Sequence, residues 1–206
     1  MSEKNFFIYK FLNKTYFYLF IQKVMGGKKA REKIIRENNI KKNCNILDIG
    51  CGPAYVLDFL KNKSLRYFGY DTEKNHIEYA KKKFLNKNYF FFCKKFNKIE
   101  INKLPKFDYI FLFGIIHHLN NTEIIEIIFL IKKILKKNGK LIILDNILIK
   151  KQNIISKILI KLDKGNYARS LSEYKILLRK NFKSFSYNII KQKFIPYTWF
   201  TAVCSK

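Results

Sequence analysis

The stretch from Asn45 to Leu60, NILDIGCGPAYVLDFL, most constrains what this chain can fold into. A short apolar run with one acid, Asp48, leads into a turn that has glycines at positions 50 and 52, and a helical pattern begins at Tyr55. Glycine lets the backbone approach a ligand closely, and the N–H groups that start a helix attract anionic groups. The stretch therefore predicts a strand, a glycine turn and a helix that bind a nucleotide-like ligand.

Strand-like and helix-like segments alternate along the chain around this turn. Strands are expected at about 45–49, 65–70, 89–92, 107–113 and 140–144, and helices at about 55–62, 73–85 and 121–137. Such alternation is typical of a parallel sheet with helices on both faces. An asparagine and a glycine at 138–139 indicate a helix end. We therefore predict an α/β fold, Rossmann-like and doubly wound.

The rest of the chain completes one expected domain, residues 1–206. Residues 1–40 read as a helical cap interrupted by Gly26 and Gly27, which is either packed on the core or a lid hinged at these glycines. Residues 41–150 form the expected ligand-binding core. Residues 151–206 predict helices, one of which begins with a capping box of Ser170 and Glu173, and then an antiparallel hairpin. The hairpin would complete a mostly parallel, seven-stranded sheet.

Two residues narrow the class of ligand. A dinucleotide-binding turn has a third glycine, in the pattern G-x-G-x-x-G, but Tyr55 stands there and a phenol is hard to reconcile with a pyrophosphate. Asp71, 21 residues after Gly50 (71 − 50), ends the second expected strand. A carboxylate there can accept both hydroxyls of a ribose. The alternative for Asp71 is a helix cap.

Several segments, in order, resemble class I S-adenosylmethionine-dependent methyltransferases. The turn LDIGCG resembles the first motif of this family, and YFGYDTEKNHIEYAKKKF resembles its ribose-binding strand and helix. Two later segments, FDYIFLFGIIHHLNN and ILKKNGKLIILDNIL, resemble its fourth strand with the following loop and its fifth strand. This covers about residues 40–150. The tail, with DKGNYARSLSEYKILL and FIPYTWFTAVCSK, resembles a bacterial subgroup of small-molecule methyltransferases, of the type 11/25-like kind.

The resemblance implies S-adenosylmethionine as cofactor and assigns its contacts. The methionine part would be held by Asp48, Gly50, Cys51 and Gly52, and the ribose by Asp71.

Further contacts are implied for the adenine and the sulfonium. Thr72 would lie beside the adenine, while Phe113 and Gly114 would line the cofactor near the sulfonium. The chain departs from the family at two points. Ala54 stands in place of a third glycine, and the acid that often contacts the adenine amine is missing after the third strand. We expect the adenine to stack on Phe96 instead.

Candidates for chemistry and substrate binding lie outside the turn. His117 and His118 follow the fourth strand, and a histidine there can act as a general base for the methyl acceptor. A structural alternative is that His118 only anchors its loop. Tyr16 and Tyr18 in the cap, and Arg169 in a polar loop of the tail, are candidate substrate contacts. For that loop the alternative is a solvated connector.

The net charge of +27 has two interpretations. Of 42 basic residues only 5 are arginine, which leaves 37 lysines (42 − 5). Heavy use of lysine, asparagine and isoleucine is the pattern of an AT-rich genome, and phosphate recognition more often uses arginine. The charge therefore reads first as composition, and second as attraction to RNA or to anionic lipid.

Cysteine usage and the N-terminal segment bear on localisation. The 4 cysteines lie far apart, so we expect no metal site and a reducing cytoplasm. Residues 6–25 are apolar and aromatic, but lysines interrupt them well short of the ~20 apolar residues of a membrane span. A helix lying on an anionic membrane surface stays open.

These observations predict a cytoplasmic methyltransferase acting on an oxygen or nitrogen of a small molecule, with a lipid-like acceptor as one version. Family members that methylate nucleic-acid amines place an Asn-Pro-Pro-Tyr-like tetrapeptide after the fourth strand, where this chain has GIIH. This weighs against DNA and RNA bases. Two alternatives are an RNA methyltransferase and a membrane-surface binding module with a relic cofactor fold.

Overall fold

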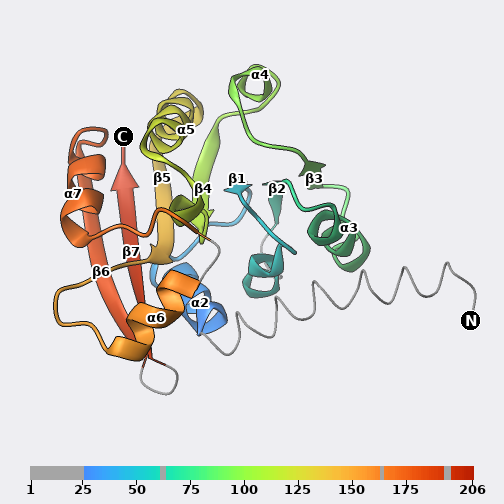
Figure 1. Ribbon diagram of the computed structural model, residues 1–206. Helices are drawn as coiled ribbons and strands as arrows, with labels where there is room; N and C mark the ends of the chain where they lie inside the picture. Colours follow the sequence, from blue (N-terminus) through green and yellow to red (C-terminus); the bar gives the residue numbers. More distant parts are fainter. Residues whose placement is uncertain (1–25, 61–63, 163–164, 193–195) are drawn as a thin grey trace, which may run out of the picture.

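The strands form one seven-stranded sheet in the order β3-β2-β1-β4-β5-β7-β6, seen from right to left in Figure 1. The structure, a computed structural model, describes residues 26–60, 64–162, 165–192 and 196–206. β1 to β5 pair in parallel, whereas β7 is antiparallel to both β5 and β6. The predicted α/β sheet with its C-terminal hairpin is confirmed.

Strands and helices alternate up to β5, as predicted. The strands are β1 Cys44–Ile49, β2 Leu65–Asp71, β3 Tyr89–Cys93, β4 Phe107–Phe113, β5 Leu135–Asn146, β6 Ser184–Gln192 and β7 Tyr197–Ser205. The described helices are α2 Gly27–Glu37, η1 Tyr55–Phe59, α3 Lys74–Lys83, α4 Lys98–Ile101, η2 Ile116–His118, α5 Asn121–Ile134, α6 Ile154–Leu162 and α7 Leu171–Arg179, where η marks a 3-10 helix.

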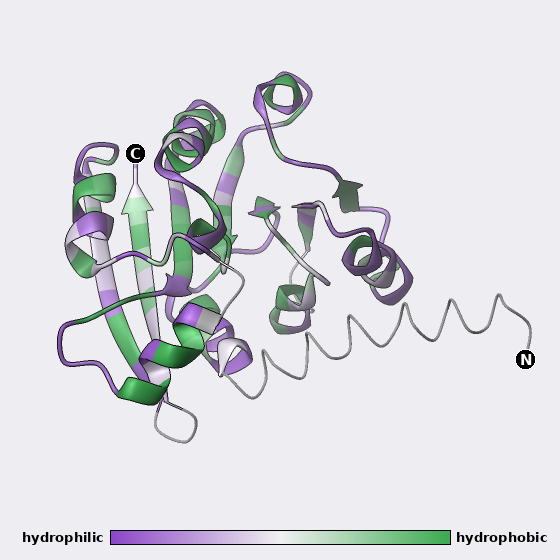
Figure 2. Ribbon diagram, viewed as in Figure 1, coloured by the Kyte–Doolittle hydropathy of each residue, from purple (hydrophilic) through white to green (hydrophobic). Residues whose placement is uncertain are grey.

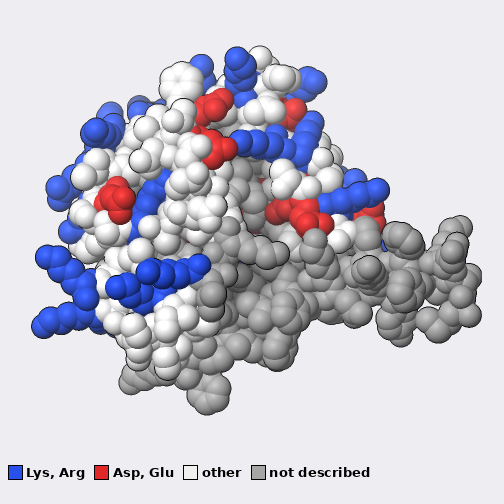
Figure 3. Space-filling view, in the orientation of Figure 1, with Lys and Arg blue, Asp and Glu red and all other residues white. Residues whose placement is uncertain are grey.

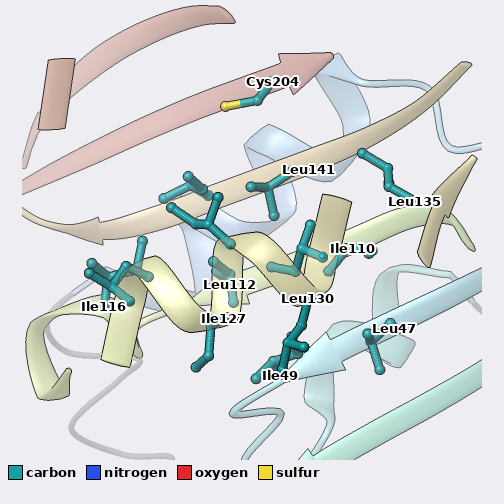
Figure 4. Close-up of a cluster of buried hydrophobic side chains, with 14 of the residues drawn as sticks. Leu47, Ile49, Ile110, Leu112, Ile116, Ile127, Leu130, Leu135, Leu141 and Cys204 are labelled. Atoms are coloured by element: carbon teal, nitrogen blue, oxygen red, sulfur yellow. The ribbon is translucent and has the colours of Figure 1, made fainter. Parts of the chain in front are cut away.

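Helices cover both faces of the sheet, so the core has two layers. Because side chains alternate along a strand, Ile46 of β1 packs with α2, η1, α3 and α6, while Leu47 packs with α5 and α7 on the opposite face. Figure 4 shows the second layer, where Ile127 and Leu130 of α5 lie over Leu112 of β4.

The strand order reverses between β1 and β4, which continue to β2 on one side and to β5 on the other. In doubly wound sheets ligands bind outside the carboxyl ends of the strands at such a switch point. The glycine turn follows β1, and His117 and His118 follow β4. The topology therefore brings the two main sequence motifs to the same edge of the sheet.

The helix predicted after the glycine turn is wrong in type and length. A 3-10 helix, Tyr55–Phe59, stands there, and β2 begins already at Leu65. A 3-10 helix rises about 2.0 Å per residue against 1.5 Å in an α-helix. It therefore returns the chain along β1 with fewer residues.

The predicted helix end at residues 138–139 is also wrong. The helix ends at Ile134, and β5 begins at Leu135, which pairs with Phe107. A Cβ at Gly139 would lie 2.9 Å from the carbonyl oxygen of Phe107. This glycine therefore permits close packing of strands where the register shifts, and does not cap a helix.

Other local predictions are confirmed. Ser170 and Glu173 form the expected capping box at the start of α7, and Asn120 with Glu123 forms another at the start of α5. The hairpin lies within a few residues of its predicted bounds. Most of the predicted cap, residues 1–25, lies outside the described residues, and none of the described helices is long and apolar enough to cross a membrane.

Candidate functional site

The glycine turn is fastened to the end of β2 by backbone hydrogen bonds. The N–H groups of Gly50 and Cys51 both donate to the carbonyl oxygen of Tyr70, over 2.8 and 3.0 Å. Gly50 has φ +74°, and a Cβ there would lie 2.6 Å from Cδ1 of Ile115. The turn therefore needs glycine at position 50 for its backbone angle and for the approach of the loop after β4.

Ala54 adopts the left-handed conformation, with φ 53° and ψ 28°. The side chain is fully buried, so packing holds it there. A residue with a Cβ meets a steric cost of roughly 1–2 kcal/mol in this conformation, which glycine would avoid.

Asp71 ties the turn to the helix that follows β2. One carboxylate oxygen accepts from the N–H of Gly52 at 2.8 Å and the other from the N–H of Glu73 at 2.8 Å. Burial acts to raise the pKa of Asp71, but hydrogen bonds from His76, Glu73 and Gly52 lower it overall. A carboxylate has about four lone-pair sites, so the charged Asp71 retains capacity for ligand hydroxyls.

Asp48, the acid of β1, is buried beside the turn. Its Oδ2 accepts a hydrogen bond of 2.5 Å from the hydroxyl of Tyr67, while its buried Oδ1 has no hydrogen-bond partner among the described residues. Burial raises the pKa of Asp48 to about 7, against the lowering effects of Tyr67 and Arg31. Asp48 thus offers a buried acceptor whose charge depends on what binds next to it.

Sequence reasoning missed Arg31 of α2, which reaches this edge of the sheet. It is 5% exposed, its Nη2 donates to the carbonyl oxygen of Phe113 at 3.4 Å, and its guanidinium lies 5.0 Å from the ring centroid of Tyr55. The sequence offered no signal for it, because Arg36, Arg66 and Arg179 of the same chain are exposed. Arg31 places a buried positive charge near Asp48 and the end of β4.

The end of β4 provides the opposite side of the site. Gly114 has φ +72°, and a Cβ there would lie 3.3 Å from Nη2 of Arg31. Phe113 is buried and stacks on Phe111, with ring centroids 4.8 Å apart. The structure thus brings Phe113 and Gly114 beside Arg31; their contact with a cofactor stays a prediction.

His117 is paired with Asp145, a second residue that the sequence did not reveal. Nδ1 of His117 and Oδ1 of Asp145 lie 2.5 Å apart, and Oδ2 of Asp145 accepts from the N–H of Ile116 at 2.6 Å. Asp145 is fully buried at the end of β5, next to β4 in the sheet. A carboxylate on Nδ1 fixes the ring orientation and favours the proton on that nitrogen, which leaves Nε2 as the basic atom.

A loop of the tail lies over His117. A Cβ at Gly165 would lie 2.0 Å from Cδ2 of the imidazole, and the N–H of Tyr167 donates to the carbonyl oxygen of His117 at 2.9 Å. His117 is buried, while His118 is exposed with its ring centroid 4.1 Å from that of His117. The two histidines therefore differ in environment, and their catalytic role stays a prediction.

The prediction that Arg169 binds a substrate carboxylate or phosphate is wrong. Arg169 is 4% exposed, and its guanidinium donates to the carbonyl oxygens of Ile116 and Leu119, both at 2.8 Å. It also donates to the carbonyl oxygen of Tyr167 and to Oδ1 of Asn121, both at 3.1 Å. The donors are thus engaged in holding the His117 loop in shape.

Phe96 is not placed to stack on an adenine. Its side chain is 3% exposed and meets the ring of Tyr70 edge to face, so its ring is part of the hydrophobic core and this prediction is corrected. Thr72 is exposed at the end of β2. The nearby acid, Glu100, forms an ion pair with Nζ of Lys94 at 2.8 Å and accepts a hydrogen bond from the hydroxyl of Tyr70 at 3.1 Å.

Tyr16 and Tyr18 lie outside the described residues. Within the described ranges, no group of three or more His, Cys, Asp or Glu side chains could hold a metal ion.

Comparison with known proteins identifies the core of the chain. Residues 47–141 match the family model of a methyltransferase domain. The chain contains a methyltransferase domain. This region includes the glycine turn, Asp71 and the two histidines, so the resemblance to class I methyltransferases is confirmed for it.

Relatives named as methyltransferases match parts of this chain. Ribosomal RNA small subunit methyltransferase A of Mesomycoplasma hyopneumoniae (strain 232) is 40% identical over 67 residues, 32% of this chain and 26% of the relative. Ubiquinone biosynthesis O-methyltransferase of Pelagibacter ubique (strain HTCC1062) is 32% identical over 128 residues, 53% of this chain and 47% of the relative. The chain thus spans about a quarter to a half of the length of these relatives.

Solved structures share the fold over most of the chain. A SAM dependent methyltransferase from Archaeoglobus fulgidus has a TM-score of 0.68 and 18% identity, and the match covers 92% of this chain and 100% of that one. The plantazolicin methyltransferase BamL has a TM-score of 0.66 and 19% identity, with 94% of this chain and 90% of that one covered.

We predict that Arg169→Met lowers the free energy of unfolding by about 3 kcal/mol, because buried carbonyl oxygens lose their donors. Urea unfolding measures this change. The matched control is Arg179→Met at the exposed end of α7, which should change stability little. Equal effects of the two variants would contradict the structural role of Arg169.

We also predict a pH effect of Asp48. A carboxyl group whose pKa is raised in the folded state binds its proton more tightly there, so its contribution lowers stability as pH rises from about 4 to 7. Asp48→Asn removes this contribution, and its advantage in unfolding free energy should grow by up to about 1.4 kcal/mol per pH unit over that range. Glu126→Gln, at an exposed acid of α5, is the control; parallel pH curves for wild type and Asp48→Asn would refute the effect.

Proposed function

We propose that this protein transfers a methyl group from S-adenosylmethionine to an oxygen or nitrogen atom of a small, lipid-like molecule. The observation that carries the proposal is the convergence of Asp48, the glycine turn and Asp71 at the carboxyl ends of β1 and β2, inside a methyltransferase domain. The fold shared with a SAM dependent methyltransferase from Archaeoglobus fulgidus supports it.

The residues at this edge of the sheet fit the parts of the cofactor. Asp71 has spare acceptor capacity for two ribose hydroxyls, and the buried Oδ1 of Asp48, which has no described partner, suits the ammonium of the methionine part. Arg31 offers a charge and a fork that match the carboxylate of the same part. When bound, the cofactor supplies an electrophilic methyl group on a positively charged sulfur.

The chain's own residues would then orient the acceptor and take its proton. His117 suits the role of general base better than His118, because Asp145 orients its ring and stabilises the imidazolium that forms on proton uptake. Gly165 leaves space for the imidazole, and Arg169 holds the backbone around it. Burial of His117 keeps water away from the position where the proton is transferred.

Two observations support the proposed class of acceptor, namely one relative and the lack of one tetrapeptide motif after β4. The ubiquinone biosynthesis O-methyltransferase aligns over 53% of this chain, and its name describes methylation of an oxygen in the biosynthesis of ubiquinone. After β4 the described chain continues with Gly114, Ile115, Ile116 and His117, without the Asn-Pro-Pro-Tyr-like tetrapeptide of amine-methylating nucleic-acid enzymes. Both observations support a small-molecule acceptor.

RNA is the second candidate acceptor. The relative named ribosomal RNA small subunit methyltransferase A is 40% identical, although over 67 residues only, and the net charge is +27. Positive charge alone favours any polyanion. This match covers 32% of the chain and 26% of the relative, against 53% and 47% for the O-methyltransferase, so RNA ranks below the small molecule.

We predict that the protein binds S-adenosylmethionine and S-adenosylhomocysteine in calorimetric titration, and that Asp71→Ala weakens both by about 10- to 100-fold. The reason is the loss of charge-assisted hydrogen bonds to the ribose hydroxyls. Glu78→Ala on the adjacent α3 is the matched control, because it also removes a carboxylate while leaving the turn intact. Failure of the wild type to bind either compound would defeat the proposal.

A labelling experiment separates the two acceptors. The protein is incubated with radiolabelled S-adenosylmethionine, a membrane lipid extract and ribosomal RNA, and the label is counted in the organic and RNA fractions. We expect the label in the organic fraction. Label in RNA, together with RNA affinity that falls steeply between about 50 and 200 mM salt, would establish the second candidate instead.

A further inference from the structure

Helix α6 exposes three isoleucines while it buries a serine. Ser156 is 1% exposed, whereas Ile154, Ile155 and Ile158 are 66%, 51% and 49% exposed. A surface helix of a soluble protein normally shows the opposite arrangement. In Figure 2 α6 lies in the lower part of the view, and much of its ribbon has the hydrophobic colour.

The inward side of α6 is held by polar contacts, which fixes this orientation. The hydroxyls of Ser156 and Thr198 of β7 lie 3.1 Å apart, and Nε2 of Gln152 donates to the Ser156 hydroxyl at 3.0 Å and to the carbonyl oxygen of Ile147 at 3.0 Å. Ile160 is fully buried on the same side. Rotation of α6 to bury its isoleucines would break these contacts.

The exposed isoleucines form one strip. At 100° per residue, positions 154, 158 and 155 fall within an arc of about 100° on the helix surface. Exposed apolar side chains that are contiguous mark an interaction surface, whereas single ones are ordinary.

The charged residues of the described segment 147–162 are all lysines. Lys150, Lys151, Lys157 and Lys161 are exposed, and residues 147–162 contain no acid. In Figure 3 the coloured side chains around α6, at the lower left, are basic. The exposed Ile125 and Phe129 of α5 differ, because the acids of that helix lie among them.

From this combination we propose that α6 is a membrane-docking helix, which inserts Ile154, Ile155 and Ile158 into the surface of an anionic bilayer. Its lysines bind the lipid head groups. An apolar strip flanked by lysine is the pattern of helices that lie in the membrane interface, and each lysine near an anionic surface adds attraction. The charge complementarity favours a lipid surface over a second copy of this basic chain.

The position of α6 connects this surface to the candidate active site. Residues 165–167 follow the helix after a short connection, and this segment lies on His117. A bilayer at α6 would therefore lie next to the loop that covers the proposed base. This consequence, that the acceptor is delivered from the membrane, rests on the proposed function, whereas docking itself does not.

Vesicle co-sedimentation of the full chain tests the docking without any cofactor. The vesicles contain phosphatidylcholine with phosphatidylglycerol in equal amounts, or phosphatidylcholine alone. We expect binding to the anionic vesicles, and a fall of about tenfold or more in the partition coefficient for the double variant Ile155→Ser with Ile158→Ser. Both side chains are exposed, so the variant should retain the wild-type thermal unfolding curve.

Two matched controls make the result specific. Ile125→Ser with Ile176→Ser removes two isoleucines that are each 55% exposed on other helices, and should leave binding unchanged. Lys157→Glu with Lys161→Glu should weaken binding more than Lys81→Glu with Lys82→Glu on α3, which alters the net charge equally.

Three results would overturn the proposal. The first is a wild type that does not bind anionic vesicles, and the second is equal effects of the α6 and control variants, which would assign binding to net charge. The third is light scattering showing a wild-type dimer that the isoleucine variant dissociates, with no effect on vesicle binding. Each result is independent of S-adenosylmethionine binding, so the proposed function is judged separately.

Discussion

The end of β2 is the support on which the candidate site depends. Its last two residues accept four N–H groups, because Tyr70 takes those of Gly50 and Cys51 while Asp71 takes those of Gly52 and Glu73. The conformation of the turn after β1 therefore depends on its hydrogen bonds to β2. The acids of β1 and β2 are held at fixed positions, and Arg31 adds the positive charge that offsets their mutual repulsion.

Much of the fold could be predicted because its signals are local. Apolar runs and capping boxes depend on a few adjacent residues, and the strands appear within a few residues of their expected positions. The errors arose where tertiary contacts decide. The pairing of Leu135 with Phe107 starts β5 inside the predicted helix, and the short return to Leu65 makes η1 a 3-10 helix.

The residues of the candidate site also fall into those that local sequence predicted and those that depend on distant contacts. The turn and Asp71 are found by spacing, since the strands that carry them are neighbours. Contacts that cross the fold were missed: His117 with Asp145 spans 28 residues of sequence, and Arg31 with Phe113 spans 82. Arg169 was assigned to substrate because an arginine in a polar loop looks solvent-exposed, but its contacts lie about 50 residues away in the chain. Arginine type alone did not decide this, because Arg31 and Arg169 are buried whereas Arg36, Arg66 and Arg179 are exposed.

The antiparallel strand β7 has a consequence for how the molecule is assembled. It lies between β5 and β6, and β6 has β7 as its strand partner. β6 is synthesised before β7, but it can join the sheet only after β7 has paired with β5. Phe200 and Cys204 of β7 are fully buried in the same core as α5. During synthesis the apolar edge of β5 stays open, and a nascent chain that stops before β7 would expose a strand edge prone to association with other chains.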